Sequence, residues 1–153
     1  MRTISLWQPW ASLWLSPAKL HETRHWATPY RGPLMVHAAK KFVKDVEPEL
    51  STILDDEFGW CWDSDLPTGV IIGMVDLVDC VPTDDLYYGR NNLSVDELID
   101  KLCGDHDWGR FAWRRGSYRR FKQPIPYRGH QSFFDVPEAI VKAQMEASEL
   151  RAA

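Results

Sequence analysis

The chain has 153 residues, 44% of them hydrophobic, which is enough for one domain with a substantial core. No apolar run approaches the ~20 residues that cross a bilayer, and no basic region precedes an apolar one at the N-terminus. We therefore expect a cytoplasmic protein without a membrane partner. The three cysteines form no C-x-x-C pair, which favours reduced thiols over a disulfide or a zinc site.

The net charge of −4 conceals an uneven distribution. Residues 1–44 carry seven Lys or Arg and one acid, residues 45–107 carry two against seventeen, and residues 108–153 carry nine against four. Two basic ends therefore flank an acidic middle. If the ends pack side by side, they form a basic face suited to phosphate; if they pack on the middle, the charges pair with one another.

The first predicted elements are short. Residues 3–6 alternate like a strand, and Pro9 can begin a short helix. A strand, a turn and a further strand follow at residues 20–26, 28–32 and 34–38. Apolar spacings of three and four predict a helix over residues 41–58, which Pro48 divides, and residues 59–68 have the composition of a loop.

The second half opens with the clearest strand, residues 70–81, in which Gly73 marks a bulge or a close contact. After an irregular connection, Ser94 and Glu97 form a capping box that starts a helix, and Gly104 ends it. The next elements are a strand over residues 110–114, a turn over 115–117 and a strand over 118–121. A proline-rich edge segment over 124–126, a short strand over 131–134 and a helix over 137–151 follow. The whole pattern predicts an α+β domain, a small, mostly antiparallel β-barrel with helices packed outside.

Six groups of residues recur in an order that resembles the ASCH family, named for activating signal cointegrator homology. They are Leu6-x-Gln8-Pro9-Trp10-Ala11-Ser12-Leu13, Lys19-x-x-Glu22-x-Arg24-x-Trp26-x-Thr28, Tyr30-Arg31-Gly32-x-Leu34, Pro67-x-Gly69, Gly73-x-Val75-Asp76-Leu77-x-Asp79-Cys80 and Pro124-Ile125-Pro126-x-x-Gly129-x-Gln131. The resemblance implies a PUA-like β-barrel with a cleft, and a family tied to RNA metabolism, nucleic-acid binding and, in some members, hydrolysis. It implies one domain over residues 1–153, with a motif-bearing core of about 4–137 and a C-terminal helix of about 137–151.

Two positions depart from the family pattern. The family commonly has Gly two residues before the motif lysine, where this chain has Pro17, so the loop that presents Lys19 should be stiffer. Members that hydrolyse N-acylated cytidine are expected to have Thr three residues after that lysine. Here the position is Glu22, which argues against that reaction.

Lys19, Glu22 and Arg24 form the densest candidate site. In a strand, Glu22 and Arg24 share a face, and Lys19 can reach back from the preceding loop. A carboxylate between two cations stays ionised and orients both, so the cations could hold a phosphate, or a desolvated Lys19 could act as a base. The alternative is a purely structural ion pair at the edge of the cleft.

His21-Glu22-Thr23-Arg24-His25 spells H-E-x-x-H, the string of zinc proteases. That chemistry needs a helix, whereas this alternating segment predicts a strand with the two histidines about 13 Å apart at ~3.3 Å per residue. We therefore expect no metal. No phosphate-loop, dinucleotide or serine-hydrolase motif is present, and we expect no cofactor.

Two functional hypotheses follow. In the first, RNA or another single-stranded nucleic acid binds a basic, Trp-edged cleft, with Trp14 and Trp113 left in the core. The binding residues would be Trp7, Gln8, Trp10, Lys19, Arg24, Tyr30, Arg31, Lys40, Arg114, Arg119, Arg128 and Gln131.

In the second hypothesis, the chain is a metal-independent hydrolase of a modified, N-acylated nucleoside or of RNA. Lys19 would be the base or activator, Glu22 would orient it, and Thr23, Thr28 or Ser132 would be the nucleophile.

Overall fold

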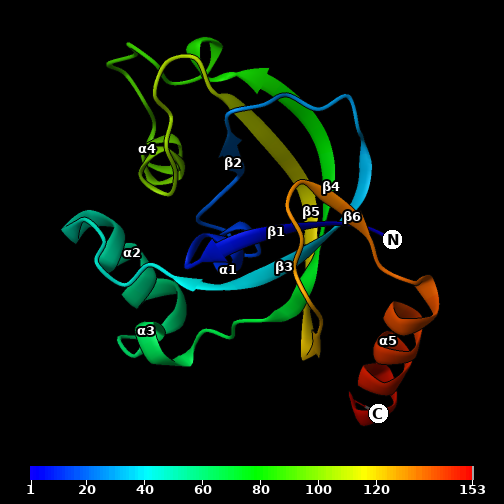
Figure 1. Cartoon of the computed structure of the whole chain (residues 1–153). Helices are drawn as coiled ribbons and strands as arrows, with labels where there is room; N and C mark the ends of the chain where they lie inside the picture. The colour runs from blue at the N-terminus through cyan, green and yellow to red at the C-terminus, as the bar shows by residue number, and fades with distance from the viewer. Residues whose placement is uncertain (153) are drawn as a thin grey trace.

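A computed structural model describes the backbone of residues 1–152 and the side chains of residues 1–146. Six strands form one strongly curved sheet in the order β2-β5-β4-β3-β1-β6 (Figure 1). They are β1 (Arg2–Gln8), β2 (His21–Arg24), β3 (Gly32–Phe42), β4 (Val70–Pro82), β5 (Phe111–Pro126) and β6 (Phe133–Asp135). Neighbouring strands are antiparallel except for the parallel pair β1 and β3. The α+β class is therefore confirmed.

Five α-helices and one short 3-10 turn surround the sheet. They are α1 (Trp10–Trp14), α2 (Pro48–Phe58), α3 (Trp62–Asp65), η1 (Thr83–Asp85), α4 (Val95–Leu102) and α5 (Glu138–Ala152). Helices α2, α3 and α4 lie together at one end of the molecule, and α5 lies at the other (Figure 1). None of the helices in residues 1–152 combines the length and the apolar character needed to cross a membrane.

The sheet does not close into the expected barrel. Its edge strands, β2 and β6, have four and three residues, and no backbone pairing joins them within the described chain. Side chains bridge the gap instead, because the ring of Trp26, just after β2, lies 5.3 Å from the ring of Phe133 in β6. The same indole lies 4.7 Å from Trp113. The open edges are thus sealed by aromatic packing rather than by hydrogen bonds.

Apolar side chains form a cluster on each side of the sheet and a third beneath the helices. Trp14 and Trp113 are fully buried, as the sequence predicted, in the cluster between α1 and the strands. A second cluster joins α1 to α2 and α3 through Leu13 and Leu54. The third packs α5 on the far face of the sheet, where Val141 is buried.

The sequence prediction was wrong about residues 110–121. It divided them into two strands around a turn, but β5 is continuous from Phe111 to Pro126. The turn signal at Gly116 belongs to an irregular stretch of pairing, where the β4–β5 register shifts between Val75 and Leu77. A Cβ at Gly116 would lie 3.1 Å from Val78 Cγ1, so the glycine permits close approach of the two strands.

The prediction of a helix over residues 41–58 was only partly correct. Strand β3 continues to Phe42, and α2 begins at Pro48, which occupies the first helical turn, where its missing N–H costs nothing. The segment predicted as a loop, residues 59–68, contains the single turn α3.

Two local predictions are confirmed. Ser94 and Glu97 make the reciprocal bonds of a capping box at the start of α4. Gly73 is a point of close approach in β4, because a Cβ there would lie 2.2 Å from the carbonyl oxygen of Arg119 on β5.

Candidate functional site

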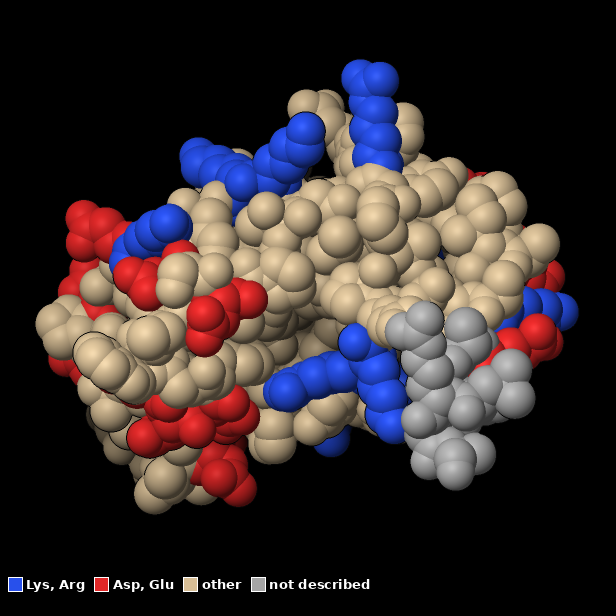
Figure 2. Space-filling model, turned by 90° about the horizontal axis from the view of Figure 1, so that it is seen from below, with Lys and Arg blue, Asp and Glu red and all other residues tan. Residues whose placement is uncertain are grey.

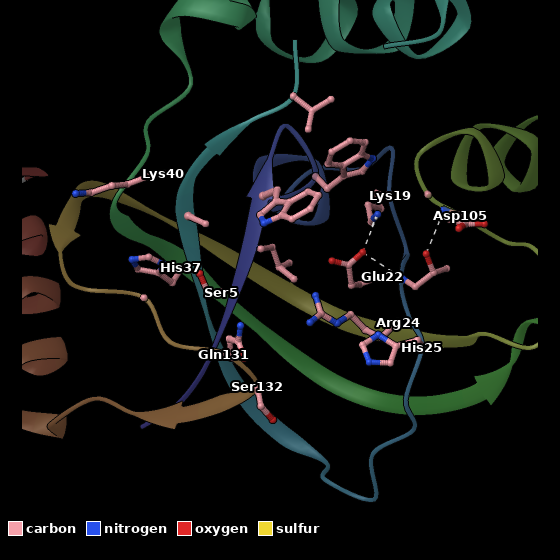
Figure 3. Close-up of a pocket in the computed structure, with 18 of the residues that line it drawn as sticks. Ser5, Lys19, Glu22, Arg24, His25, His37, Lys40, Asp105, Gln131 and Ser132 are labelled. Carbon is pink, nitrogen blue, oxygen red and sulfur yellow. Dashed lines mark hydrogen bonds and ion pairs between the residues drawn. The ribbon is translucent and has the colours of Figure 1, made fainter. Parts of the chain in front are cut away.

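A cleft of about 1870 Å³ opens between the sheet and the helical end of the molecule. Its walls come from β1, β2, β3, the segment after β3, the α4–β5 loop and the β5–β6 loop. Figure 3 shows polar side chains from several of these segments around one space, among them Glu22, Arg24 and Gln131. Segments from both ends of the chain therefore meet at the cleft.

Most of the residues predicted for function line this cleft. They are Trp7, Trp10, Lys19, Glu22, Thr23, Arg24, Lys40, Arg128, Gln131 and Ser132. Six predicted residues do not line it: Gln8, Thr28, Tyr30, Arg31, Arg114 and Arg119.

Lys19 and Glu22 form a buried ion pair in the wall of the cleft. The ammonium of Lys19 has no exposed surface; it lies 3.1 Å from Glu22 Oε1 and donates to the Cys103 carbonyl at 2.6 Å. Glu22 also accepts from the backbone N–H of Thr23 at 3.0 Å. Two of the three ammonium donors are therefore engaged within the protein, and the ammonium is not exposed to the cleft.

Arg24 is a cation of the cleft with a buried donor that the described residues leave unsatisfied. It follows Glu22 on the same face of β2, and its Nε is buried without a hydrogen-bond partner among the described residues. Its guanidinium carbon lies 6.0 Å from the ring centroid of Trp26. A buried N–H without a partner is costly, so this position favours a ligand that accepts a hydrogen bond.

The α4–β5 loop closes the wall beside β2. The backbone N–H of Asp105 donates to Thr23 Oγ1 at 3.1 Å, and the Asp105 carboxylate lies 3.5 Å from Arg110 Nε. Arg110 also donates to the carbonyl of Thr23 at 3.3 Å. Thr23, a candidate nucleophile, therefore holds this loop in place.

Charge in the cleft is modestly positive once these pairs are removed. The lining cations are Lys19, Arg24, Lys40, Arg110 and Arg128, and the lining acids are Glu22, Asp45, Glu47 and Asp105. Lys19 pairs with Glu22 and Arg110 with Asp105, so the positive charges without an ion pair in the described chain are Arg24, Lys40 and Arg128. Figure 2 shows a dense group of acids at the end of the molecule that carries α2 and α3.

The predicted residues near the start of β3 stabilise turns outside the cleft. Thr28 is buried and its Oγ1 accepts from the Tyr30 N–H at 3.1 Å. Arg31 donates to the carbonyl of Thr28 at 2.9 Å and lies 3.7 Å from Asp79. Gln8 is also buried outside the cleft, and its side-chain amide donates hydrogen bonds to Ser12 Oγ and to the Pro67 carbonyl, both at 2.8 Å.

The arginine-rich strand β5 contributes less to the cleft than its sequence suggested. Arg115 is buried and donates to the carbonyls of Lys19 and Ser16, at 3.0 and 2.6 Å, which fixes the loop before β2. Arg114 and Arg119 are exposed on β5, away from the cleft-lining residues. Only Arg110 and Arg128, at the two ends of this segment, reach the cleft.

The two histidines of the H-E-x-x-H string have different surroundings. His21 is buried, and its Nδ1 lies 2.7 Å from a carboxylate oxygen of Asp100, which also accepts from Tyr87 at 2.8 Å. Burial raises the pKa of Asp100, but its bonds to His21 and Tyr87 outweigh this and lower it to about 2. His25 is exposed at the cleft. No group of residues able to hold a metal ion occurs among the described residues.

Sequence reasoning missed a pair of hydrogen-bonded residues in the opposite wall. Ser5 of β1 and His37 of β3 are cross-strand partners, and Ser5 Oγ lies 2.8 Å from His37 Nδ1. His37 Nε2 lies 2.7 Å from the Tyr127 carbonyl. Each residue is ordinary in its own strand pattern, and only the parallel pairing of β1 with β3 brings them together. The glycine in Tyr127-Arg128-Gly129 was the available signal for a close approach.

A family model of the ASCH domain matches residues 4–93. The chain belongs to the ASCH domain family. The match begins within β1, continues past β4 and includes the Lys19–Glu22 pair, while β5 and the loop that carries Gln131 lie beyond it.

Two curated relatives share part of this ASCH domain. Activating signal cointegrator 1 of Homo sapiens is 40% identical over 85 residues, and that of Mus musculus is 39% identical over 85 residues. Each alignment covers 51% of this chain but only 14% of the relative.

Solved structures resemble the ASCH domain over almost its whole length. The crystal structure of ASCH from Zymomonas mobilis aligns with a TM-score of 0.54 at 18% identity, covering 95% of this chain and 93% of that one. A mutant of the same Zymomonas mobilis protein, in which a tyrosine is replaced by phenylalanine, aligns with a TM-score of 0.54 at 16% identity, covering 95% and 96%. At these identities the likeness establishes the fold alone.

Proposed function

We propose that the cleft of this ASCH domain binds a segment of single-stranded RNA. The observation that carries the proposal is Arg24, whose buried Nε faces the cleft without a partner among the described residues and beside an aromatic ring. A phosphate oxygen would accept from this guanidinium with the geometry that arginine favours. Lys40 and Arg128, which line the same cleft, would contact neighbouring phosphates.

Aromatic side chains at the cleft suit nucleobases. Trp7 is half exposed and Trp10 partly exposed, and both line the cleft at the end of β1. The ammonium of Lys41 lies 3.9 Å from the ring centroid of Trp7, which holds that indole at the surface. A base stacked on an accessible indole gains about 1–3 kcal/mol.

The size of the cleft supports an extended ligand. Its volume of about 1870 Å³ exceeds the roughly 300–1,000 Å³ typical of pockets for single small molecules. A run of several nucleotides would use this space, with phosphates at the cations and bases at the indoles. The tie between the ASCH family and RNA metabolism, inferred from the sequence resemblance, favours RNA over DNA.

Binding of a fluorescent single-stranded RNA, followed by anisotropy, tests the proposal. We expect Arg24→Ala to weaken binding at least tenfold and Lys40→Ala severalfold, because each removes a phosphate contact. The matched controls are Arg114→Ala and Lys122→Ala, which remove exposed cations of β5 outside the cleft. Equal losses in the controls and the cleft variants would reject the cleft as the site and point to general attraction by positive charge.

A second candidate function, hydrolysis of a modified nucleoside, is favoured by the buried Lys19–Glu22 pair. Once a bound substrate gives access to the buried ammonium, a lysine beside a carboxylate could polarise a carbonyl or position water. The double variant Lys19→Met/Glu22→Gln removes both charges together and avoids an unpaired buried carboxylate. We expect it to abolish any turnover of N-acylated nucleosides or labelled RNA by the folded protein. Turnover that persists in this variant would reject the mechanism.

A further inference from the structure

The wall of the cleft opposite Lys19 holds a serine, a histidine and a carbonyl in series. Ser5 Oγ lies 2.8 Å from His37 Nδ1, and His37 Nε2 lies 2.7 Å from the carbonyl oxygen of Tyr127. Ser5 is partly exposed and His37 is buried, and both line the cleft. Figure 3 shows the two side chains next to each other, with Gln131 on the same side of the cleft.

The carbonyl fixes the tautomer of the imidazole. A carbonyl oxygen can only accept, so His37 Nε2 must carry the proton of this bond. In the neutral ring, Nδ1 is then unprotonated and accepts from the Ser5 hydroxyl. The lone pairs of Ser5 Oγ are left for a group in the cleft.

The environment keeps the imidazole in this neutral form. Burial lowers the pKa of His37 below 6.5, and nearby His130 acts in the same direction, against the bond to Tyr127, which raises it. At pH 7 the ring is therefore able to take up a proton. Geometry and protonation state together match the relation between a nucleophile, its base and the group that orients the base.

Gly129 lies directly against this pair. A Cβ on Gly129 would lie 2.8 Å from His37 Cε1 and 2.9 Å from Ser5 Oγ. Any other residue would push against both side chains. The glycine thus allows the β5–β6 loop to pass close to the pair, while Ser5 stays partly exposed.

We propose that Ser5 is a nucleophile activated by His37, and that the cleft accepts and cleaves carboxylic esters by acyl transfer to Ser5. Ser5 Oγ bonds to the ester carbonyl carbon while its proton moves to His37 Nδ1. The tetrahedral oxyanion collapses, the bond to the alcohol oxygen breaks, and His37 returns the proton to the departing alcohol. Water then attacks the acyl-serine, again through His37, and releases the carboxylic acid and free Ser5.

Other cleft residues have definite parts in this reaction. Tyr127 positions His37 through its carbonyl and does not touch the substrate. The side-chain amide of Gln131 offers N–H donors to the oxyanion. The reaction uses neither Lys19 nor a phosphate contact. A failed test of RNA binding would therefore not reject it, and a failed test of acylation would not reject RNA binding.

Acylation by p-nitrophenyl acetate tests the proposal on the full chain. We expect release of p-nitrophenolate and one acetyl group on the peptide that contains Ser5, identified by mass spectrometry. General-base assistance contributes about 10²–10⁴-fold, so His37→Gln should slow acetylation of Ser5 at least 100-fold. Ser5→Ala should abolish this adduct, and Ser117→Ala, which removes an exposed hydroxyl of β5 outside the cleft, should behave as the wild type.

Three results would overturn the proposal. They are acetylation confined to lysines, a wild-type protein in which Ser5 remains unmodified, and equal acetylation of Ser5 in His37→Gln. A thermal unfolding curve for each variant separates loss of reactivity from loss of the fold. A fourth variant, Gly129→Ala, should also block acetylation, because its methyl group would press against the hydroxyl and the imidazole while leaving Ser5 and His37 in the sequence.

Discussion

His106 is a buried histidine whose ring nitrogens have no hydrogen-bond partner among the described residues. It packs beside Tyr87, with the rings 5.1 Å apart. Burial lowers the pKa of His106 from 6.5 to about 4, opposed by the charge of Asp100 and assisted by that of Lys19. Folding therefore requires the neutral ring, and acid should destabilise the protein well above the range in which carboxylates titrate.

The change from pH 7 to pH 5 should remove about 2 kcal/mol from the free energy of unfolding through His106 alone. The unfolded chain binds a proton as the pH falls through 6.5, whereas the folded chain does so only near 4. Urea denaturation at the two pH values measures this loss. In His106→Phe, most of the pH dependence should vanish, and the part due to His37 should remain. An unchanged pH dependence in the variant would contradict the assignment.

Helix α4 links the capping box to the cleft. It is capped by Ser94, carries Asp100, and ends beside Cys103, whose carbonyl accepts from Lys19. Asp100 in turn accepts from the backbone N–H groups of Leu20 and His21, at 2.6 and 3.0 Å. The helix thus holds the segment that presents the Lys19–Glu22 pair.

Loss of the cap should therefore destabilise the wall of the cleft that α4 holds. Ser94→Ala should lower the free energy of unfolding by about 1 kcal/mol and speed hydrogen exchange along α4. Thr52→Ala, which deletes a hydroxyl inside α2, should be neutral or slightly stabilising, because alanine favours helix and the threonine only bonds back to Pro48. Equal losses in both variants would argue against a specific role of the capping box.

The elements differ in how far local sequence determined them. The capping box at Ser94 and the branched residues of β4 are local signals, and both predictions were confirmed. The turn signal at Gly116 misled because a glycine at a register shift in paired strands looks like a glycine in a turn. The barrel prediction failed because strand closure depends on edge lengths and on the Trp26–Phe133 contact, which no local pattern contains.

The candidate site also contains residues that local sequence identified and residues that it did not. Spacing in β2 placed Glu22 and Arg24 on one face, and the family resemblance drew attention to Lys19. Arg114 and Arg115 are neighbours and point to opposite faces of β5, and which of these faces packs against the rest of the protein depends on the tertiary fold. The Ser5–His37 pair depends on a parallel register across 32 positions, which sequence periodicity does not encode.

At the scale of the whole molecule, the net charge is a poor guide to ligand binding. The protein is acidic, with a net charge of −4, yet the cleft retains three cations without an ion pair in the described chain: Arg24, Lys40 and Arg128. The acids of the middle segment gather largely at the end that carries α2 and α3 (Figure 2). Distant acids are screened over about 10 Å at 0.1 M salt, so the local charge is set by these three cations and by the lining acids Asp45 and Glu47, and it stays positive.

RNA affinity should therefore depend on salt only moderately. Three phosphate contacts predict a slope of about −2 for the logarithm of the association constant against the logarithm of salt concentration, at ~0.7 for each contact on a single strand. Lys40→Ala should reduce the slope by about 0.7, and Lys122→Ala should leave it unchanged. Anisotropy titrations over a range of salt concentrations measure both. A slope much steeper than about −2 would mean that the exposed arginines of β5 also take part.

The sheet order also bears on how a nascent chain could acquire this fold. β5 lies between β2 and β4, and β6, near the C-terminus, pairs with β1 at the N-terminus. A ribosome that has made only residues 1–93 has delivered the family-matched segment but no partner for β2, and the aromatic seal between the sheet edges cannot form. We expect the emerging protein to stay open, and to attract chaperones, until β5 and β6 leave the exit tunnel.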